Sequence, residues 1–373
     1  MMGDRFLLLP LDDPHSSARI IAEHSKRVHF DAVVAVDDQG TLAATAAAEM
    51  LGLAHNPFEA TAATRDKLAM RKKFAASQVP QPAFAVLEPG SDPGAVAGSI
   101  GFPCVLKPIS LSGSRGVIRA DDAQGARSAA ERIWAMLASL GGAGPAELLV
   151  EEFIPGVEVA VDGLLSSGSL QVLAIFDKPD PLDGPYFEET IYVTPSRLTA
   201  REIAAIREAT SSAAHALGLV EGPVHAELRL HANKALAPTV IEIAARNLGG
   251  LCARILTFGT GISLEEIVLA HALHKLEALP KIQAGAAGVM MLPIPAGGTL
   301  AAVEGRKEAL QVPGITGLEI TIPLGARVYP LPEGDRYLGF LFAHCEDPRA
   351  AELALRTAFA SLDIQIIPTE PPD

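Results

Sequence analysis

The sequence predicts a chain of the α/β and α+β classes that folds into more than one domain. Its 373 residues are more than a single hydrophobic core usually organises. Strand and helix patterns alternate over the first 62 residues, which is typical of a doubly wound parallel sheet. Farther along, strand pairs joined by tight turns alternate with helices, as in α+β subdomains.

Composition and charge exclude several classes of partner. The formal net charge is −14, and the longest basic cluster, Arg71-Lys72-Lys73, lies on a helical pattern that we interpret as a solvated face. Nucleic acid is therefore excluded as the main partner, because phosphate backbones need clustered Lys and Arg. No apolar run reaches about 18 residues, so no membrane span is expected. Three widely spaced cysteines and an N-terminus without a signal-peptide pattern favour a cytoplasmic protein without disulfides.

The N-terminal region is expected to consist of two βα units. Strands are predicted over Phe6–Leu9 and Ala32–Val36, and helices over Ser16–His24 and Thr41–Leu51, the second closed by Gly52. Loops after such strands are where parallel sheets bind ligands, although a turn with an N-cap is the favoured interpretation here. The weak substrate-site candidates in this loop are Asp37, Asp38, Gly40 and Thr41.

A loop of small residues follows the next predicted strand. Helices are expected over residues 64–77, 91–99 and 123–140, and strands over residues 82–87, 101–108, 116–119, 147–153 and 157–165. The loop from Ser112 to Gly116 offers free backbone N–H groups without bulky side chains, which suits a phosphate, although a plain hairpin loop is the alternative. Lys107 ends the preceding strand among apolar residues and favours an anionic ligand beside this loop.

The stretch from Val150 to Gly163 places two carboxylates on either side of a Pro-Gly turn. Glu151 and Glu158 are seven positions apart, and the alternation of the following strand turns Glu158 away from its apolar neighbours. A carboxylate there could accept both hydroxyls of a ribose, while a polar edge strand is an equally good interpretation. A return strand over residues 170–177, a mobile Pro- and Gly-rich loop over residues 178–194 and a helix over residues 198–217 are expected next.

The hairpin from Glu221 to Gly250 carries the strongest candidates. Its strands hold one carboxylate each, and a turn near residues 233–235 would place Glu227 and Glu242 side by side. Two such carboxylates repel unless a cation lies between them, and hard oxygen ligands suit Mg²⁺ held with the phosphates of a nucleotide. Arg246, four residues beyond Glu242, is placed to hold an anion beside that metal. A solvated hairpin with two exposed acids is the alternative.

The C-terminal third is predicted to mix helices with short strands. Helices are expected over residues 251–258, 263–276 and 348–362, with short strands and Gly/Pro turns between them and a last strand over residues 363–367.

Together these motifs resemble the ATP-grasp superfamily, and within it the carboxylate–amine ligases close to the dipeptide-forming L-amino acid ligases. The likeness extends from about Asp31 to Ile367. It implies an ATP-grasp fold with a shortened N-terminal subdomain (residues 1–62), an ATP-grasp domain (63–275, with a flexible part at about 107–165) and a closing α+β subdomain (276–373). It also implies small-molecule substrates, and a homodimer is a common arrangement for such folds.

The resemblance gives each candidate a role. It implies that ATP is held by Lys67, Lys107, Ser112, Gly113, Ser114, Glu151, Phe153, Ile154, Glu158 and Lys178. Of these, Lys67 and Lys107 match the lysines that bind the phosphates. Glu151 matches the residue that contacts the adenine amino group, and Glu158 matches the carboxylate that binds the ribose. Mg²⁺, with Mn²⁺ as an alternative ion, would be bound by Glu227 and Glu242, and Arg246 would stabilise a tetrahedral intermediate. Substrate contacts are expected from Glu189, Tyr192, His225 and Gly250.

The chain departs from the family pattern at three places. The N-terminal subdomain is short, Ala244 stands where many relatives have Asn, and Tyr192 stands where dipeptide-forming relatives have His. Gly250 has no side chain to narrow the pocket, so larger substrates are expected to fit. For His225, a role in capping the strand is slightly favoured over a contact with substrate. For Tyr192 and Arg197, contact with a lid and a position on the surface are equally good predictions.

The reaction implied by the resemblance is phosphorylation of a carboxylate by ATP, followed by attack of an amine on the acyl phosphate. Mg²⁺ and lysines would spread the charge of the transferring phosphoryl group, and a fixed cation would stabilise the oxyanion. Lids are expected at the Ser112–Gly116 loop and over residues 178–194, because an acyl phosphate hydrolyses in water. The alternatives are an ATP-grasp enzyme that activates bicarbonate or formate, and a nucleotide-binding protein without catalysis.

Overall fold

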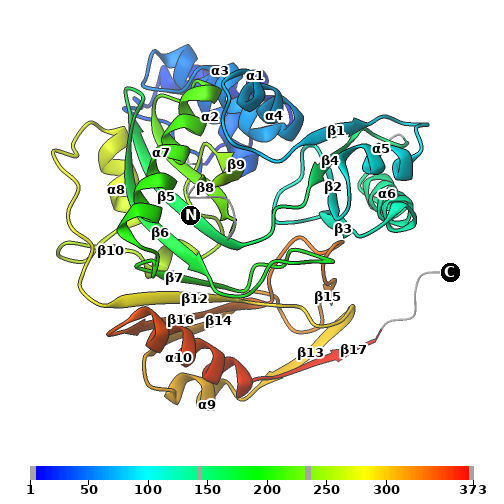
Figure 1. Cartoon of the computed structure of the whole chain (residues 1–373). Helices are drawn as coiled ribbons and strands as arrows, with labels where there is room; N and C mark the ends of the chain where they lie inside the picture. The colour runs from blue at the N-terminus through cyan, green and yellow to red at the C-terminus, as the bar shows by residue number, and fades with distance from the viewer. Residues whose placement is uncertain (1–5, 142–143, 232–236, 369–373) are drawn as a thin grey trace.

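A computed structural model describes residues 6–141, 144–231 and 237–368 (Figure 1). A large sheet runs through the middle of the molecule, with the N-terminal helices on one side of it and a smaller sheet with two helices projecting beside it (Figure 1). All strand pairs in the described residues are antiparallel. Within the same residues, no helix is long and apolar enough to cross a membrane.

The large sheet has eight strands and connects the middle of the chain to its C-terminal part. Its strand order is β14-β16-β12-β7-β6-β5-β8-β9. The strands are β5 (Val157–Ser166), β6 (Ser169–Lys178), β7 (Ile191–Thr194), β8 (Gly222–Leu230), β9 (Thr239–Ala244), β12 (Ala286–Leu292), β14 (Ile315–Ile320) and β16 (Gly339–Cys345). The hairpins predicted at residues 157–177 and 221–250 are confirmed as β5–β6 and β8–β9.

Helices cover one face of this sheet beside β5, β8 and β9. They are α3 (Phe58–Arg65), α4 (Lys67–Ala76) and α7 (Ala200–Leu217). Apolar side chains such as Met70, Phe74 and Ile206 meet Val159 and Leu228 from the strands in one buried cluster. Burying such side chains contributes roughly 1.5–3 kcal/mol each, so this packing fixes the position of the strands beneath it.

The smaller sheet forms a separate layer with its own core. Its order is β1-β4-β2-β3. Its elements are β1 (Phe84–Leu87), α5 (Pro93–Ile100), β2 (Cys104–Pro108), β3 (Ile118–Ala120), α6 (Ala123–Ser139) and β4 (Leu148–Glu152). Leu106 and Val150 from the strands pack on Ala130 and Ile133 of α6. The predictions for this region hold to within a few residues at each boundary, as is usual for element ends.

The N-terminal region contains two helices and no sheet in its described residues. The helices α1 (Pro14–Ser25) and α2 (Asp38–Leu51) are confirmed, and Gly52 closes α2 with φ 68°. The strands predicted at residues 6–9 and 32–36 are wrong, because neither segment has a partner strand. A strand needs a neighbour for its N–H and C=O groups. Here Leu9 and Val33 instead pack their side chains against α1 and α2.

The C-terminal part adds the far edge of the large sheet and a small three-stranded sheet. The remaining elements are α8 (Leu264–Ala272), β10 (Thr257–Phe258), β11 (Ile262–Ser263), β13 (Gly298–Glu304), α9 (Arg306–Gln311), β15 (Arg327–Val328), α10 (Pro348–Ala360) and β17 (Asp363–Ile367). The helix predicted over residues 251–258 is wrong: only Cys252–Ile255 is helical, as a short 3₁₀ turn. The loop predicted over residues 178–194 is also shorter than expected, since it begins in β6 and ends in β7.

We predict that Gly156→Ala distorts the start of β5. Gly156 has φ 123°, and a Cβ there would lie 2.1 Å from the Leu230 carbonyl oxygen. Backbone strain and overpacking together should lower the free energy of unfolding by about 2–4 kcal/mol, measured by urea denaturation. Gly168→Ala is the matched control, because Gly168 has φ 82° with open space around it. Equal losses in the two variants would contradict the steric argument.

Candidate active site

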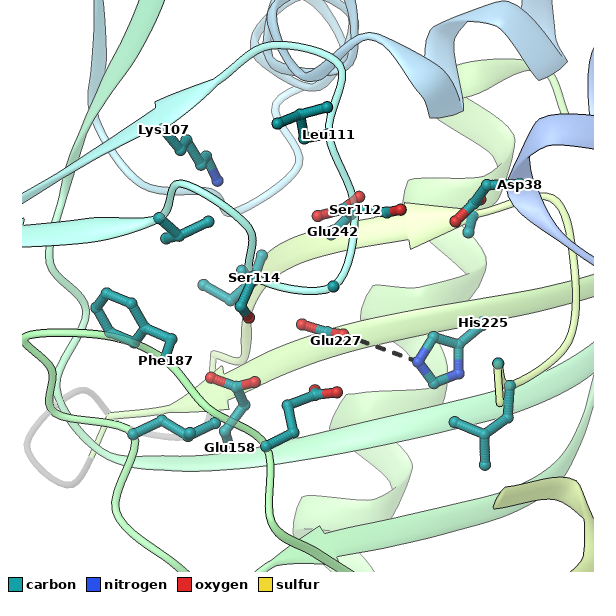
Figure 2. Close-up of a pocket in the computed structure, with 18 of the residues that line it drawn as sticks. Asp38, Lys107, Leu111, Ser112, Ser114, Glu158, Phe187, His225, Glu227 and Glu242 are labelled. Carbon is teal, nitrogen blue, oxygen red and sulfur yellow. Dashed lines mark ion pairs between the residues drawn. The ribbon is translucent and has the colours of Figure 1, made fainter. Parts of the chain in front are cut away.

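A cavity of about 520 Å³ lies where the two sheets and the N-terminal helices meet (Figure 2). Of the site residues predicted from sequence, all but Lys178 line it. They are Lys67, Lys107, Ser112, Gly113, Ser114, Glu151, Phe153, Ile154, Glu158, Glu189, Tyr192, His225, Glu227, Glu242, Arg246 and Gly250. Residues far apart in the sequence are thus brought to one place, although their roles stay predictions.

The central carboxylates belong to β8 and β9. Glu227 and Glu242 are direct cross-strand partners, so the prediction that the hairpin places them side by side is confirmed (Figure 2). Lys67 Nζ lies 3.3 Å from Glu242 Oε1 and donates to the Leu111 carbonyl oxygen at 2.6 Å. Lys67 is buried, and through these two contacts it joins β9 to the small-residue loop.

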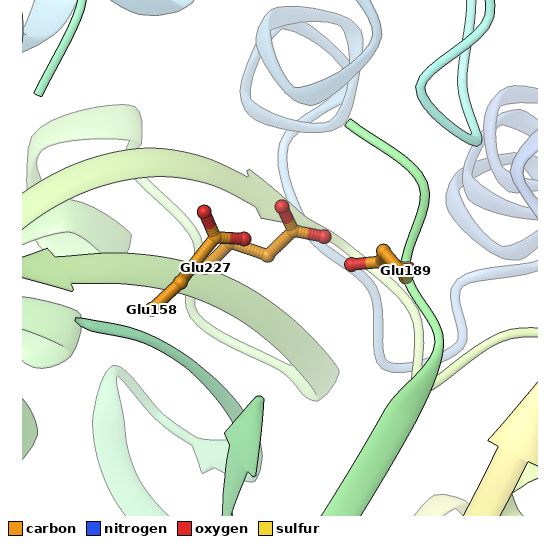
Figure 3. A group of neighbouring side chains, drawn as sticks. All are labelled: Glu158, Glu189 and Glu227. Atoms are coloured by element: carbon orange, nitrogen blue, oxygen red, sulfur yellow. The ribbon is translucent and has the colours of Figure 1, made fainter. Parts of the chain in front are cut away.

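Lys178 lies beneath the cavity instead of lining it. Its ammonium pairs with Glu158 at 2.7 Å, with Glu189, and with Glu227 at 3.6 Å. These three carboxylates approach within 4.8 Å of one another (Figure 3). Burial alone would lower the pKa of Lys178, but the carboxylates raise it, so the ammonium stays charged. Lys178, which the resemblance assigns to ATP binding, is therefore the counter-ion of an acidic cluster.

Glu189 and Glu227 differ in their affinity for protons. Burial raises the pKa of Glu189, and Glu227 adds to this effect. Burial would also raise the pKa of Glu227, but Lys178, His225 and Arg246 outweigh it and lower that pKa. Glu227 is thus held ionised, as a metal ligand must be.

His225 belongs to a buried polar chain. Its Nδ1 lies 2.9 Å from Asp162 Oδ1, and its Nε2 faces Glu227 Oε1 at 3.8 Å (Figure 2). Burial would lower the pKa of His225, but the two carboxylates raise it to about 9. The strand-cap interpretation is wrong. Asp162, which also accepts from the Leu248 backbone N–H at 3.1 Å, was not identified from the sequence, although it has the alternation expected of an inward-facing residue.

A second buried ion cluster joins the smaller sheet to α4. Glu151 accepts from Arg71 Nε at 2.6 Å through one oxygen, and its other oxygen lies 2.6 Å from Lys107 Nζ. Arg71 also donates to the Ile241 carbonyl oxygen at 2.6 Å. The interpretation of Arg71 as a solvated residue is wrong, since its side chain is 1% exposed. Both Glu151 oxygens pair with cations, and Glu151 also lines the cavity, so its contact with an adenine stays a prediction.

These charges perturb one another. Burial would raise the pKa of Glu151, but Arg71 and Lys107 lower it to about 2. Burial lowers the pKa of Lys107, with Arg71 and Lys67 acting in the same direction and Glu151 opposing them. An anionic ligand beside Lys107 would restore the charge balance that burial removes.

Arg229 organises the hinge between the two sheets. It donates to Glu158 Oε2 at 2.6 Å and to the carbonyl oxygens of Ile154, at 2.7 Å, and Leu182. Its guanidinium also lies over the ring of Phe153, 5.3 Å from the centroid. Glu158 is therefore fixed from two sides, by Arg229 and Lys178. No sequence pattern pointed to Arg229, because its partners come from three distant segments.

The small-residue loop is held by the C-terminal part of the chain. The Gly116 backbone N–H donates to the Pro332 carbonyl oxygen at 2.9 Å, and Arg115 Nε donates to the Glu333 carbonyl oxygen at 3.0 Å. Arg132 adds a two-point contact with the Glu333 carboxylate at 2.6 and 2.9 Å. Gly113 and Ser114 have φ values of 65° and 55°, and such a turn directs successive N–H groups to one side.

The opposite end of the cavity is more apolar. Its wall is formed by Leu248, Cys252, Met291, Tyr337 and Phe340. A Cβ on Gly250 would lie 3.1 Å from the Phe340 ring, so the extra room expected beside Gly250 is taken by that ring.

Tyr192 and Arg197 differ in exposure: Tyr192 is buried, and Arg197 is exposed. Tyr192 is buried on β7 and donates from its hydroxyl to Glu189 at 2.7 Å. Arg197 pairs with Asp177 and Glu352, each at 2.8 Å. The surface position considered for Arg197 is therefore confirmed, and the one considered for Tyr192 is wrong.

The N-terminal loop reaches the cavity through two acidic residues, Asp37 and Asp38. Asp37 caps α2 by accepting from the Gly40 N–H at 2.9 Å, which confirms the favoured N-cap interpretation. Asp38 also lines the cavity, where its Oδ2 accepts from Arg246 at 2.8 Å. Burial would raise the pKa of Asp38, but Arg246 and Arg65 lower it.

The residues fit a nucleotide and a divalent cation. Lys67, Lys107 and the N–H groups after Ser112 supply cationic and neutral donors at one end of the cavity. Adjacent carboxylates on β8 and β9 supply hard oxygen ligands. Apolar surfaces of Phe153 and Phe187 flank the hinge, as a base needs.

Two family models match separate parts of the chain. The ATP-grasp domain family matches residues 100–255, and the family described as L-amino acid ligase C-terminal domain 2 matches residues 290–366. A crystal structure of an L-amino acid ligase from Bacillus licheniformis superposes with a TM-score of 0.77 at 27% identity, covering 97% of this chain and 87% of that one.

Curated relatives match shorter stretches. Alanine–anticapsin ligase of Bacillus subtilis (strain 168) is 30% identical over 219 residues, 54% of this chain and 45% of the relative. A D-alanine–D-alanine ligase of Aromatoleum aromaticum is 32% identical over 162 residues, 43% of this chain and 50% of the relative. The chain spans about half the length of the curated relatives it matches.

We predict that Glu151→Gln is strongly destabilising at neutral pH. The pKa of Glu151 is lowered from 4.5 to about 2 in the folded chain. Its ionised form therefore stabilises the fold above pH 4.5, and this contribution, about 3 kcal/mol, is lost as the pH falls toward 2. The free energy of unfolding of the parent should exceed that of the variant at pH 7, with the difference shrinking below pH 4.5.

The control is Glu152→Gln, whose parent carboxylate only accepts from the Ala83 N–H at 3.3 Å. It should cost about 1 kcal/mol or less. Denaturant titrations at several pH values measure both variants. A pH-independent difference between the parent and Glu151→Gln would contradict the ion-cluster argument.

Proposed function

Because this chain is an ATP-grasp protein that carries an L-amino acid ligase C-terminal domain, we propose that it is an ATP-dependent ligase that joins the carboxylate of one amino acid to the amine of another. The observation that carries the proposal is the meeting, in one cavity, of phosphate-type cations, paired carboxylates and a separate arginine. Nucleotide binding alone would need no cation beyond the phosphate and metal ligands.

The reaction has two steps that balance without a further reagent. A substrate carboxylate oxygen bonds to the γ-phosphorus of ATP, and ADP leaves, which gives an acyl phosphate. The amine nitrogen of the second substrate then bonds to the carbonyl carbon, the bond to phosphate breaks, and the amine releases its proton. The products are an amide, ADP and phosphate.

Two lysines beside the small-residue loop are proposed to bind the phosphates. Lys67 and Lys107 approach the cavity from α4 and β2, and the backbone after Ser112 adds N–H donors. The Lys67 ammonium is anchored by the Leu111 carbonyl oxygen, which fixes it beside the loop. Such preorganised donors stabilise charge on a transferring phosphoryl group.

The carboxylates are proposed to hold the metal and the ribose. Mg²⁺ bound by Glu227 and Glu242 would neutralise phosphate charge. Glu158, oriented by Arg229 and Lys178, is proposed to accept ribose hydroxyls, with Phe153 and Ile154 beside the base. Arg246 is proposed to stabilise the oxyanion formed by amine attack, since it lies in the same cavity without pairing directly with either Glu227 or Glu242 among the described contacts.

An amino acid explains the apolar end of the cavity better than a one-carbon substrate. Leu248, Cys252, Met291, Tyr337 and Phe340 present apolar surface there, and bicarbonate or formate has no side chain to bury against it. The relatives named for alanine–anticapsin and D-alanine–D-alanine ligation support the same choice. A homodimer and a cytoplasmic location stay predictions.

We predict that amino acids stimulate phosphate release from ATP and Mg²⁺. The test measures released phosphate with each of the twenty amino acids, singly and in pairs, and identifies the coupled product by mass spectrometry. Stimulation confined to bicarbonate or formate would replace this proposal by the carboxylase alternative. Tight ATP binding without turnover on any carboxylate would favour a nucleotide-binding protein.

We predict that Arg246→Ala slows amide formation by about 10²–10³-fold while ATP binding is retained, because an oxyanion donor contributes about that much. Arg254→Ala is the control, since Arg254 is half exposed and pairs with Glu319 outside the cavity. Product formation and nucleotide titration measure the two effects. Equal rates for Arg246→Ala and the parent would remove Arg246 from the mechanism.

We predict that Glu242→Gln raises the Mg²⁺ concentration needed for half-maximal turnover, because a neutral amide is a weaker ligand than a carboxylate. Glu265→Gln, at an exposed position on α8, is the control. Magnesium titrations of phosphate release compare the variants. An unchanged magnesium dependence in Glu242→Gln would count against the metal assignment.

A further inference from the structure

We propose that Asp38 is a positioning residue that holds the Arg246 guanidinium in place for the amide-forming step, a proposal that rests on the proposed ligase function. Asp38 is the first residue of α2, and Arg246 follows β9, so the contact joins the N-terminal helices to the large sheet. Asp38 Oδ2 accepts from an Arg246 terminal nitrogen at 2.8 Å. The two side chains are 14% and 16% exposed, which places the pair at the cavity wall.

The Asp38 carboxylate is fully used by protein cations. Its other oxygen, Oδ1, pairs with Arg65 at 3.2 Å. With one oxygen on each guanidinium, the Asp38 carboxylate is held from both sides by protein cations. We therefore assign Asp38 to the orientation of Arg246, and the test below separates this role from binding of the amine.

The charge count keeps Arg246 able to attract an anion. One carboxylate lies between two guanidinium groups, so the cluster of Asp38, Arg65 and Arg246 has a net positive charge. An oxyanion that develops in the cavity still finds an uncompensated cation. Because Arg65 shares the Asp38 carboxylate, the negative charge of Asp38 does not fall on Arg246 alone.

The position of Arg246 is fixed from several directions. Its second terminal nitrogen donates to the Asn247 carbonyl oxygen at 2.9 Å. The loop that follows is tied to β5, since Asp162 Oδ1 accepts from the Leu248 N–H at 3.1 Å. On the other side, the Thr41 hydroxyl donates to the Asp38 carbonyl oxygen at 2.8 Å and steadies the start of α2. An arginine held this way needs no reorganisation when charge develops.

Through the contact between Asp38 and Arg246, the short N-terminal region also contributes to the site. Arg65 ends α3, and Lys67 begins α4 two residues later. Asp38 thus joins the arginine proposed for the amide step to the segment that carries a lysine proposed for the phosphates. A displacement of α2 would disturb both ends of the cavity.

The test separates the two half-reactions in Asp38→Asn. Acyl phosphate formation is followed by positional isotope exchange in ATP with the carboxylate substrate alone, and amide formation by product analysis. We expect kcat for the amide to fall about tenfold or more, as misplacement of a catalytic group does, with isotope exchange and the amine KM within about twofold of the parent. Asp38→Glu, which keeps the charge, should recover part of the lost kcat.

Asp13→Asn is the matched control, because Asp13 caps α1 in the same region and lies outside the cavity. It should leave both half-reactions unchanged. A raised amine KM with unchanged kcat in Asp38→Asn would make Asp38 a substrate ligand and overturn the proposal. So would equal losses in both half-reactions together with a lower melting temperature, which would indicate a purely structural role.

A second measurement does not depend on turnover. Phenylglyoxal labelling of Arg246, followed by peptide mass spectrometry, should be faster in Asp38→Asn than in the parent and in Asp13→Asn, because the guanidinium loses its anchor. Equal labelling rates would overturn the positioning contact. A parent that joins no pair of substrates would instead refute the ligase function and the amide-forming role, whatever the labelling shows of the contact.

Discussion

Lys178 holds together three carboxylates that would otherwise repel one another: Glu158 of β5, Glu227 of β8 and Glu189 of the loop before β7. Its ammonium is buried, and a buried charge is tolerated only when it is closely paired. The strand order of the sheet makes this pairing possible, because β6 carries Lys178 beside β5, and β8 follows on the other side of β5. Glu227 is therefore ionised, and all three carboxylates are fixed in place before any ligand binds.

Clusters of opposite charges also occur elsewhere around the cavity. Arg71 and Lys107 share Glu151, and Arg65 and Arg246 share Asp38. In each case one acidic side chain stands between two cations, so a positive charge remains for a ligand. The shared carboxylate reduces the repulsion between the two cations, and both cations stay available to bind a polyanion.

Sequence reasoning succeeded where the controlling interactions are local and failed where they are distant. The Glu227–Glu242 register follows from a hairpin, and the helix start at Asp37 and stop at Gly52 follow from capping chemistry within a few residues. The apolar run at residues 32–36 has the pattern of a strand by the same local rules. Among the described residues, however, no strand pairs with it. Arg71 likewise looks solvated until Glu151, eighty residues later, is placed beside it.

The shape of the cavity is decided by the part of the chain that carries least sequence signal. The segment around Pro332 and Glu333 accepts hydrogen bonds from the small-residue loop at Gly116 and Arg115. A few residues on, Tyr337 lines the apolar end of the same cavity. Opening of the small-residue loop must therefore break contacts with a segment that also shapes the end proposed for the amino acid. If the proposed sites are right, we expect closure over the phosphates and the fit of the second substrate to be coupled through this short stretch of backbone.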